Sequence, residues 1–265
     1  MNKNLQKYEK FLVKSIIPLL HKTSGKLTLL KKIKSRSKTK DQFDPVTTHD
    51  ISLQKKIITE IVNKFPNHGI EGEEGSSQKI NKKIKWVIDP IDGTKSFLIG
   101  MPTYSNLIGL QIEKKFKLGL AYFPVLKKHY LTKKKKSYVF LNGSYKKIKT
   151  SNIKDLKQSK MVINTLRTIK NNKYLKFFKS YKNFFKITGA DAYNYCRLAE
   201  GDIDIIFESK LKPFDIKPLI PIIINSGGVI SDWTGKKYKG SGDILVASNK
   251  VLHKKFLQLI KKKTK

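Results

Sequence analysis

The chain has 265 residues, 39% of them hydrophobic, so it is long enough to bury a full core in one large domain or in two intimately packed ones. Its single cysteine excludes an internal disulfide and a cysteine-rich zinc site, and no apolar run approaches the roughly 18–20 residues of a membrane span. The 56 Lys and Arg residues against 20 Asp and Glu give a net charge of +36.

This charge does not by itself indicate a nucleic-acid-binding protein. Arginine, which proteins that read bases and phosphates favour for its two-pronged hydrogen bonding, occurs only three times. The lysines are spread along the whole chain without a zinc-finger, RNP or helix-turn-helix pattern. Because a lysine-rich, alanine-poor composition is typical of an AT-rich genome, we interpret the charge as a solvated surface and expect no nucleic-acid partner. The N-terminus lacks a signal-peptide pattern, so we expect a cytoplasmic protein with no membrane partner.

Periodicity in the first half predicts two helices followed by a sheet. The helices are expected at 4–20 and 50–65, and a polar loop at 66–84. Short apolar runs then predict an antiparallel sheet, with Asn142-Gly143 as a hairpin turn. Its strands are expected at 86–88, 104–112, 116–123, 128–132 and 137–141.

The second half alternates between strands and helices. Strands are expected at 160–164, 203–207 and 229–232, and helices at 172–182, 191–200, 216–226 and 250–262. This order predicts an α+β fold with a soft boundary near residue 150. The halves 1–150 and 151–265 are expected to form one compact unit.

Acidic residues form four clusters against the basic background, at Asp50, Glu73-Glu74, Asp89 with Asp92, and Asp215. Oxygen ligands without neighbouring His or Cys suit Mg²⁺ rather than zinc. Two such cations about 4 Å apart can clamp the attacking and leaving oxygens of a phosphoryl transfer. Each acid also has a structural explanation, because Asp-Pro and Asp-Gly are common turns and Asp215 could cap a helix. Spacing alone leaves both interpretations open.

Three motifs resemble, in the right order, the signatures of the inositol monophosphatase-like family. They are HGIEGEEG (68–75), WVIDPIDGTKSF (86–97) and KPFDIKPLIPIIINSGGVISDWTG (212–235). The resemblance covers nearly the whole chain. It implies a layered α/β/α/β sandwich of the inositol monophosphatase and fructose-1,6-bisphosphatase type. It also implies a Mg²⁺-dependent, lithium-sensitive phosphomonoesterase that is often a homodimer.

The same resemblance assigns roles residue by residue. It implies two to three Mg²⁺ ions per site, held by Glu73, Asp89, the carbonyl of Ile91, Asp92 and Asp215. Glu73 and Thr94 would orient a metal-activated water for in-line attack, without a covalent phosphoenzyme. The amides of Gly93 and Thr94 would cradle the phosphate. Asp50 matches the acid that hydrogen-bonds the motif threonine.

The substrate is predicted from the third motif and from residues 189–209. Asp215 follows Lys-Pro-Phe rather than the Trp common in inositol monophosphatases, which resembles the histidinol-phosphate phosphatase branch. In that branch Asp191 and Glu208 fall where relatives contact the alcohol part of the substrate. Two acids suit histidinol, which carries an ammonium and a titratable imidazole. We therefore expect a histidinol-phosphatase of histidine biosynthesis.

Alternatives remain open at this point. Asp191 could be a helix N-cap and Glu208 part of a surface ion pair. The enzyme could also be an inositol-1-monophosphatase or a related sugar- or nucleotide-phosphate phosphatase. From another class, an RNA-associated regulatory protein is the main alternative, although such a protein would have no need for the complete set of acids.

Overall fold

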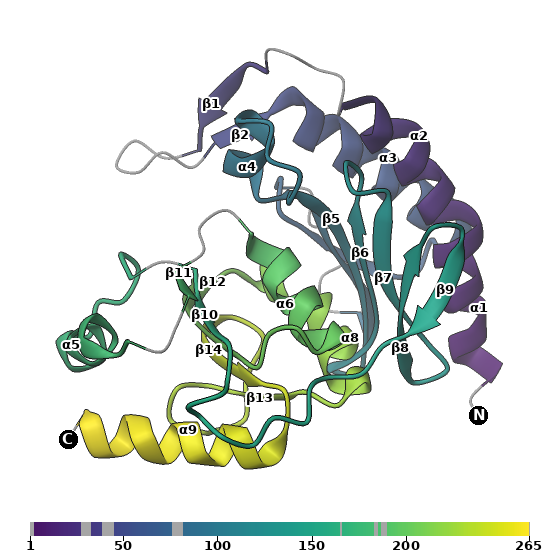
Figure 1. Ribbon diagram of the computed structural model, residues 1–265. Coiled ribbons are helices and arrows are strands. Elements are labelled where there is room, and N and C mark those ends of the chain that lie inside the picture. The colour runs from purple at the N-terminus through teal and green to yellow at the C-terminus, as the bar shows by residue number, and fades with distance from the viewer. Residues whose placement is uncertain are drawn as a thin grey trace.

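The computed structural model describes residues 3–27, 33–38, 45–75, 82–164, 166–182, 185–186 and 190–264, which fold into stacked layers of helix and sheet (Figure 1). None of the helices in these ranges has both the length and the apolarity of a membrane span.

The N-terminal segment forms the outer helical layer. Helices α1 (Lys3–Phe11) and α2 (Ile17–Leu27) are joined by the π-helical turn η1 (Leu12–Ile16), and α3 (Thr48–Lys64) lies beside them (Figure 1). Apolar side chains recur at helical spacing, so one face of each helix is buried against the first sheet. The helices predicted at 4–20 and 50–65 are confirmed. A short antiparallel pair, β1 (Ser35–Ser37) and β2 (Pro45–Thr47), lies between α2 and α3 in the chain.

The first sheet has seven strands in the order β3-β4-β5-β6-β7-β8-β9. They are β3 (Gly69–Gly72), β4 (Ile84–Asp92), β5 (Ser105–Ile112), β6 (Lys115–Phe123), β7 (Lys128–Lys133), β8 (Lys136–Leu141) and β9 (Ser144–Lys147). The predicted strands and the turn at 142–143 are confirmed. The loop predicted at 66–84 is wrong in part, because Ile70 is buried and β3 pairs in parallel with β4.

The second sheet has five strands in the order β11-β10-β12-β14-β13. They are β10 (Met161–Ile163), β11 (Phe185–Lys186), β12 (Ile205–Leu211), β13 (Val229–Ser231) and β14 (Gly242–Ala247). The helices of this half are α5 (Asn172–Ser180), α6 (Asp191–Glu200), α7 (Pro213–Ile216), α8 (Leu219–Ser226) and α9 (Lys250–Lys263). The helix predicted at 216–226 is therefore two helices, α7 and α8, and β14 was not predicted.

Three hydrophobic cores lie between the layers and hold them together. The first joins the N-terminal helices to one face of the seven-stranded sheet. The second joins the other face to α6, α8 and the five-stranded sheet, so these helices lie between the sheets (Figure 1). The third lies under α5 and α9, which cover the far face of the second sheet. This is the expected α, β, α, β order with one further helical layer.

Two glycines let the segment that carries Asp215 approach the first sheet. A Cβ atom at Gly119 on β6 would lie 1.9 Å from the carbonyl oxygen of Pro218, and one at Gly109 on β5 would lie 2.9 Å from the Cα of Pro218. Since neither distance is tolerated, only glycine allows the α7–α8 connection to rest on the sheet. Asp215, three residues before Pro218, is thereby brought to the end of β4.

Candidate active site

A cavity of about 290 Å³ lies where β4, β12 and the first turns of α4 (Thr94–Leu98), α6 and α7 meet. Nine of the ten predicted site residues line it, and Asp50 does not. The nine are Glu73, Asp89, Ile91, Asp92, Gly93, Thr94, Asp191, Glu208 and Asp215. Residues from both halves of the chain therefore contribute to one pocket.

A β-bulge directs both motif aspartates of β4 into this cavity. Residues three apart on a regular strand point to opposite faces. Here Asp89 pairs with Leu107 but Asp92 pairs with Ser105, so β4 contains one residue more than its partner strand. The buried Asn106 stabilises the bulge, because its Nδ2 donates to the carbonyl of Pro90 at 2.6 Å. Strand β4 therefore continues past Pro90 to Asp92 across the bulge.

Asp89, Asp92 and Asp215 are removed from water and lie close to one another. Burial, reinforced by Glu73, Asp92 and Asp215, raises the pKa of Asp89 well above its usual value. Burial together with nearby Asp191 and Asp215 does the same for the pKa of Asp92. Burial raises the pKa of Asp215 to about 7. The positive charge near Asp89, Asp92 and Asp215 is therefore too small to offset their burial and mutual repulsion.

This cluster has the chemistry of a site for a hard divalent cation. Its donors are all oxygens, which Mg²⁺ prefers. Asp89 Oδ1 is buried and has no hydrogen-bond partner among the described residues, so it is an acceptor that a cation would satisfy. The residues present fit such an ion.

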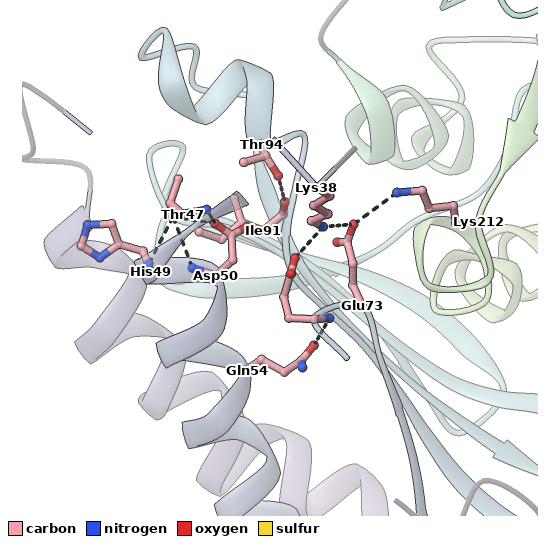
Figure 2. Close-up of polar contacts among 10 residues, drawn as sticks. Lys38, Thr47, His49, Asp50, Gln54, Glu73, Ile91, Thr94 and Lys212 are labelled. Atoms are coloured by element: carbon pink, nitrogen blue, oxygen red, sulfur yellow. Dashed lines mark hydrogen bonds and ion pairs between the residues drawn. The ribbon is translucent and has the colours of Figure 1, made fainter. Parts of the chain in front are cut away.

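Glu73 lies beside Asp89 and is also bound by lysines (Figure 2). Lys38 Nζ lies 2.8 Å from Glu73 Oε1 and 2.7 Å from Glu74 Oε1, and Lys212 Nζ lies 3.7 Å from Glu73 Oε1. Within the described ranges, no three acidic, histidine or cysteine side chains are arranged as a ready metal site. Glu73 would therefore exchange Lys38 for a metal ion. The ammonium of Lys38, which was not predicted, shows that this position attracts a cation.

The predicted hydrogen bond between Asp50 and the motif threonine Thr94 is wrong for this structure. Asp50 Oδ2 accepts from the backbone N–H of Thr47 at 2.8 Å and from its Oγ1 at 2.5 Å, because the two residues form a capping box at the start of α3. Thr94 Oγ1 instead donates to the carbonyl of Ile91 at 3.0 Å (Figure 2). Asp50 thus joins the end of β2 to the start of α3, and its buried Oδ1 has no hydrogen-bond partner among the described residues.

A second pair of acids, Asp191 and Glu208, lines the same cavity, with Asp191 close to Asp92 and Gly93. Asn164 Nδ2 lies 3.0 Å from Asp191 Oδ1 and 2.9 Å from Glu208 Oε1, so one amide bridges both carboxylates. The hydroxyl of Tyr195 donates to Glu208 Oε2 at 2.6 Å. Burial raises the pKa of Glu208 to about 7, while these two hydrogen bonds oppose the rise.

The structural explanations for these two acids are not supported. Asp191 is the first residue of α6, whose N-cap is Ala190 without a side-chain cap, so Asp191 is not the N-cap. Glu208 is bonded to the neutral side chains of Tyr195 and Asn164 rather than held in a surface ion pair. Neither Asn164 nor Tyr195 was predicted as a site residue.

The whole of this architecture has a match among known proteins. Residues 4–265 match the family model described as the inositol monophosphatase family. The chain belongs to this family. A histidinol-phosphatase from Chlorobaculum parvum is 29% identical over 247 residues, which cover 91% of this chain and 93% of that protein.

Two further comparisons agree with this membership. The chloroplastic bifunctional phosphatase IMPL2 of Arabidopsis thaliana is 33% identical over 207 residues, or 75% of this chain, but the match spans only 58% of that longer protein. A solved IMPase from Thermotoga maritima superposes with a TM-score of 0.80 at 26% identity, over 94% of this chain and 96% of that one. The fold predicted for this inositol monophosphatase family member is confirmed.

The raised pKa values predict how the metal-free protein responds to pH. Asp215 and Glu208 have pKa values near 7 in the folded state, above the usual 3.8 and 4.5. Between the unfolded and the folded pKa values, the folded protein binds more protons than the unfolded chain. The stabilisation that these two groups provide is therefore greatest at low pH and is lost as the pH rises. We expect the melting temperature in EDTA to fall by several degrees from about pH 5 to about pH 8.

Thermal unfolding followed by circular dichroism measures this slope. An Asp215→Asn variant removes one titrating group and should flatten the curve. A metal-free melting temperature that rises between the two pH values would show that the acids are not strained by burial.

Proposed function

We propose that this member of the inositol monophosphatase family is a Mg²⁺-dependent phosphomonoesterase that hydrolyses L-histidinol phosphate to L-histidinol and phosphate in histidine biosynthesis. The observation that carries the proposal is that the acids lining the cavity form two neighbouring groups, a first end with Glu73, Asp89, Asp92 and Asp215 and a second end with Asp191 and Glu208. One end has the oxygen donors of a cation site, and the other has two acids beyond those a metal needs.

The first end is suited to the phosphate group. Mg²⁺ would be held there by Glu73, Asp89, the carbonyl of Ile91, Asp92 and Asp215. When bound, the metal supplies positive charge to the phosphate oxygens and lowers the pKa of a coordinated water. The backbone amides of Gly93 and Thr94 donate to phosphate oxygens. Glu73 and Thr94 orient the water that attacks phosphorus in line, and the leaving alkoxide takes a proton from water.

The second end is suited to a cationic alcohol. Asp191 and Glu208 are held together by Asn164 and line the same cavity as the acids of the first end. Lys95, an exposed residue at the start of α4 that also lines the cavity, is a positive charge that favours the ionised form of Asp191. The ammonium of histidinol would neutralise this pair, whereas the hydroxyls of inositol would not. The histidinol-phosphatase among the relatives supports this choice.

Inositol monophosphate is the second candidate substrate. It is favoured by the description of the matching family and by the solved IMPase from Thermotoga maritima. If the purified protein hydrolysed inositol monophosphate in preference to L-histidinol phosphate, inositol monophosphate would become the proposed substrate. The roles proposed for the phosphate end of the site would stay the same.

The Asp191→Asn variant tests the role of the second end. A charge-assisted hydrogen bond contributes roughly 1.5–3 kcal/mol, so kcat/KM for L-histidinol phosphate should fall by about one to two decades. Hydrolysis of glycerol 2-phosphate, whose alcohol is neutral, should fall far less. Asparagine tolerates the positive φ of 32° at this position, so the backbone should be retained.

The matched control is Asp155→Asn, which changes an exposed aspartate outside the cavity and should leave both rates as they are. Equal losses on the two esters with Asp191→Asn would assign Asp191 to metal binding or stability. No loss on either ester would remove the argument for a cationic substrate.

A further inference from the structure

We propose that Asn164 is a positioning residue that sets substrate selectivity, because its amide group fixes the carboxylates of Asp191 and Glu208 in the geometry that receives a cationic alcohol. This inference rests on the proposed function, and it adds a residue that neither the motifs nor the family comparison assigns.

The amide is placed to act on both acids at once. Asn164 follows β10 directly, whereas Asp191 begins α6 and Glu208 lies on β12, so three separate elements meet at one nitrogen. A primary amide nitrogen carries two N–H groups, which provides one for each carboxylate. Only the nitrogen side of the amide can face two carboxylates, so the orientation of the side chain follows from its partners.

The carboxylate oxygens of Asp191 and Glu208 differ in their hydrogen-bond partners. Glu208 is held at both oxygens, by Asn164 at Oε1 and by Tyr195 at Oε2. Among the described residues Asp191 is held by a side chain at Oδ1 only, and its Oδ2 lies against Gly93, where an added Cβ atom would be 2.9 Å away. Gly93 belongs to the phosphate end of the cavity. Because Asp191 Oδ2 lies beside this phosphate end, we assign the direct contact with the cationic group to Asp191.

Without the amide, the pair would lose its geometry. Two carboxylates within reach of one nitrogen repel each other, and removing a shared donor leaves both acceptors without that partner. Asp191 also has a positive φ of 32°, a conformation that the surrounding structure must maintain. Loss of the bridge would allow the two acids to separate, and they would no longer act on a single ammonium.

The test compares Asn164→Ala and Asn164→Leu with the wild-type enzyme in the presence of Mg²⁺. Both variants remove the N–H groups, but leucine retains roughly the volume of the side chain. We expect kcat/KM for L-histidinol phosphate to fall about tenfold more than kcat/KM for glycerol 2-phosphate, mainly through KM. The Asn63→Ala variant, an exposed position on α3 outside the cavity, is the matched control.

A second readout does not require the cationic ester to be hydrolysed. L-Histidinol should inhibit glycerol 2-phosphate hydrolysis by the wild-type enzyme, and its inhibition constant should rise about tenfold in both variants. A role in packing alone predicts that leucine restores the behaviour that alanine loses. Equal losses on the two esters, restoration by leucine or an unchanged inhibition constant would each overturn the inference while the proposed function stands. A wild-type enzyme without preference for L-histidinol phosphate would overturn both.

Discussion

The Asp92→Asn variant is expected to lose phosphatase activity by a factor of at least about 100, the usual cost of removing a key electrostatic group. Asp92 is 6% exposed, and its Oδ2 accepts hydrogen bonds from the Ala192 N–H and the Ser105 hydroxyl, both at 3.1 Å. Asparagine has the same shape and keeps an acceptor oxygen, so the fold should be retained. What it loses is the negative charge that a cation beside a phosphate dianion requires.

Stability provides an independent readout of this substitution. In the metal-free protein Asp92 is buried beside other acids, and both its burial and the repulsion by Asp191 and Asp215 raise its pKa. Removing its charge should leave the melting temperature in EDTA at neutral pH unchanged or higher, while the Asp155→Asn control changes neither property. Activity above about a tenth of the wild-type value, with the fold intact, would contradict the assignment of Asp92 as a ligand.

Removal of divalent metal is expected to abolish activity completely. The four acids of the phosphate end cannot approach a phosphate dianion without positive charge between them. We expect the EDTA-treated and dialysed enzyme to release no phosphate and to regain its activity when Mg²⁺ is added. Li⁺ should inhibit the restored enzyme, as the family resemblance implies.

Binding can be measured separately from turnover. Mg²⁺ should raise the melting temperature of the stripped protein, since a ligand that binds only the folded state stabilises it. The rise should be larger at about pH 8 than at about pH 5, because the ligands must be deprotonated. Full activity of the stripped enzyme in metal-free buffer would exclude the proposed mechanism.

The elements that could be predicted are those with local patterns. Helices α1 to α3 and strands β5 to β8 follow from apolar periodicity, and the turn at 142–143 from Asn142-Gly143. Strand β3 could not be predicted in the same way, because only one of its four residues, Ile70, has a large apolar side chain and its partner is a parallel strand. A short apolar run such as that in β14 does not by itself distinguish a strand from a helix segment.

The candidate site likewise contains residues that local patterns predict and residues that they do not. The motif acids were predicted because their spacing within each motif is local, and the resemblance placed the motifs together. Lys38 and Asn164 act on acids that are 27 to 44 residues away, a relation that no local pattern carries. The signal that could have identified Asn164 is a polar residue at the carboxyl end of a predicted strand. For Asp50, the Thr-x-x-Asp spacing from Thr47 predicts the capping box that the structure shows.

Phosphate release from a panel of phosphomonoesters in Mg²⁺ buffer tests the central claim most directly. The panel contains L-histidinol phosphate, inositol 1-phosphate, glycerol 2-phosphate and a nucleoside monophosphate, each assayed with and without EDTA. The account predicts Mg²⁺-dependent release with the highest kcat/KM for L-histidinol phosphate, by about one to two decades over the neutral-alcohol esters. Release from none of these esters, with the protein folded and Mg²⁺ present, would contradict it.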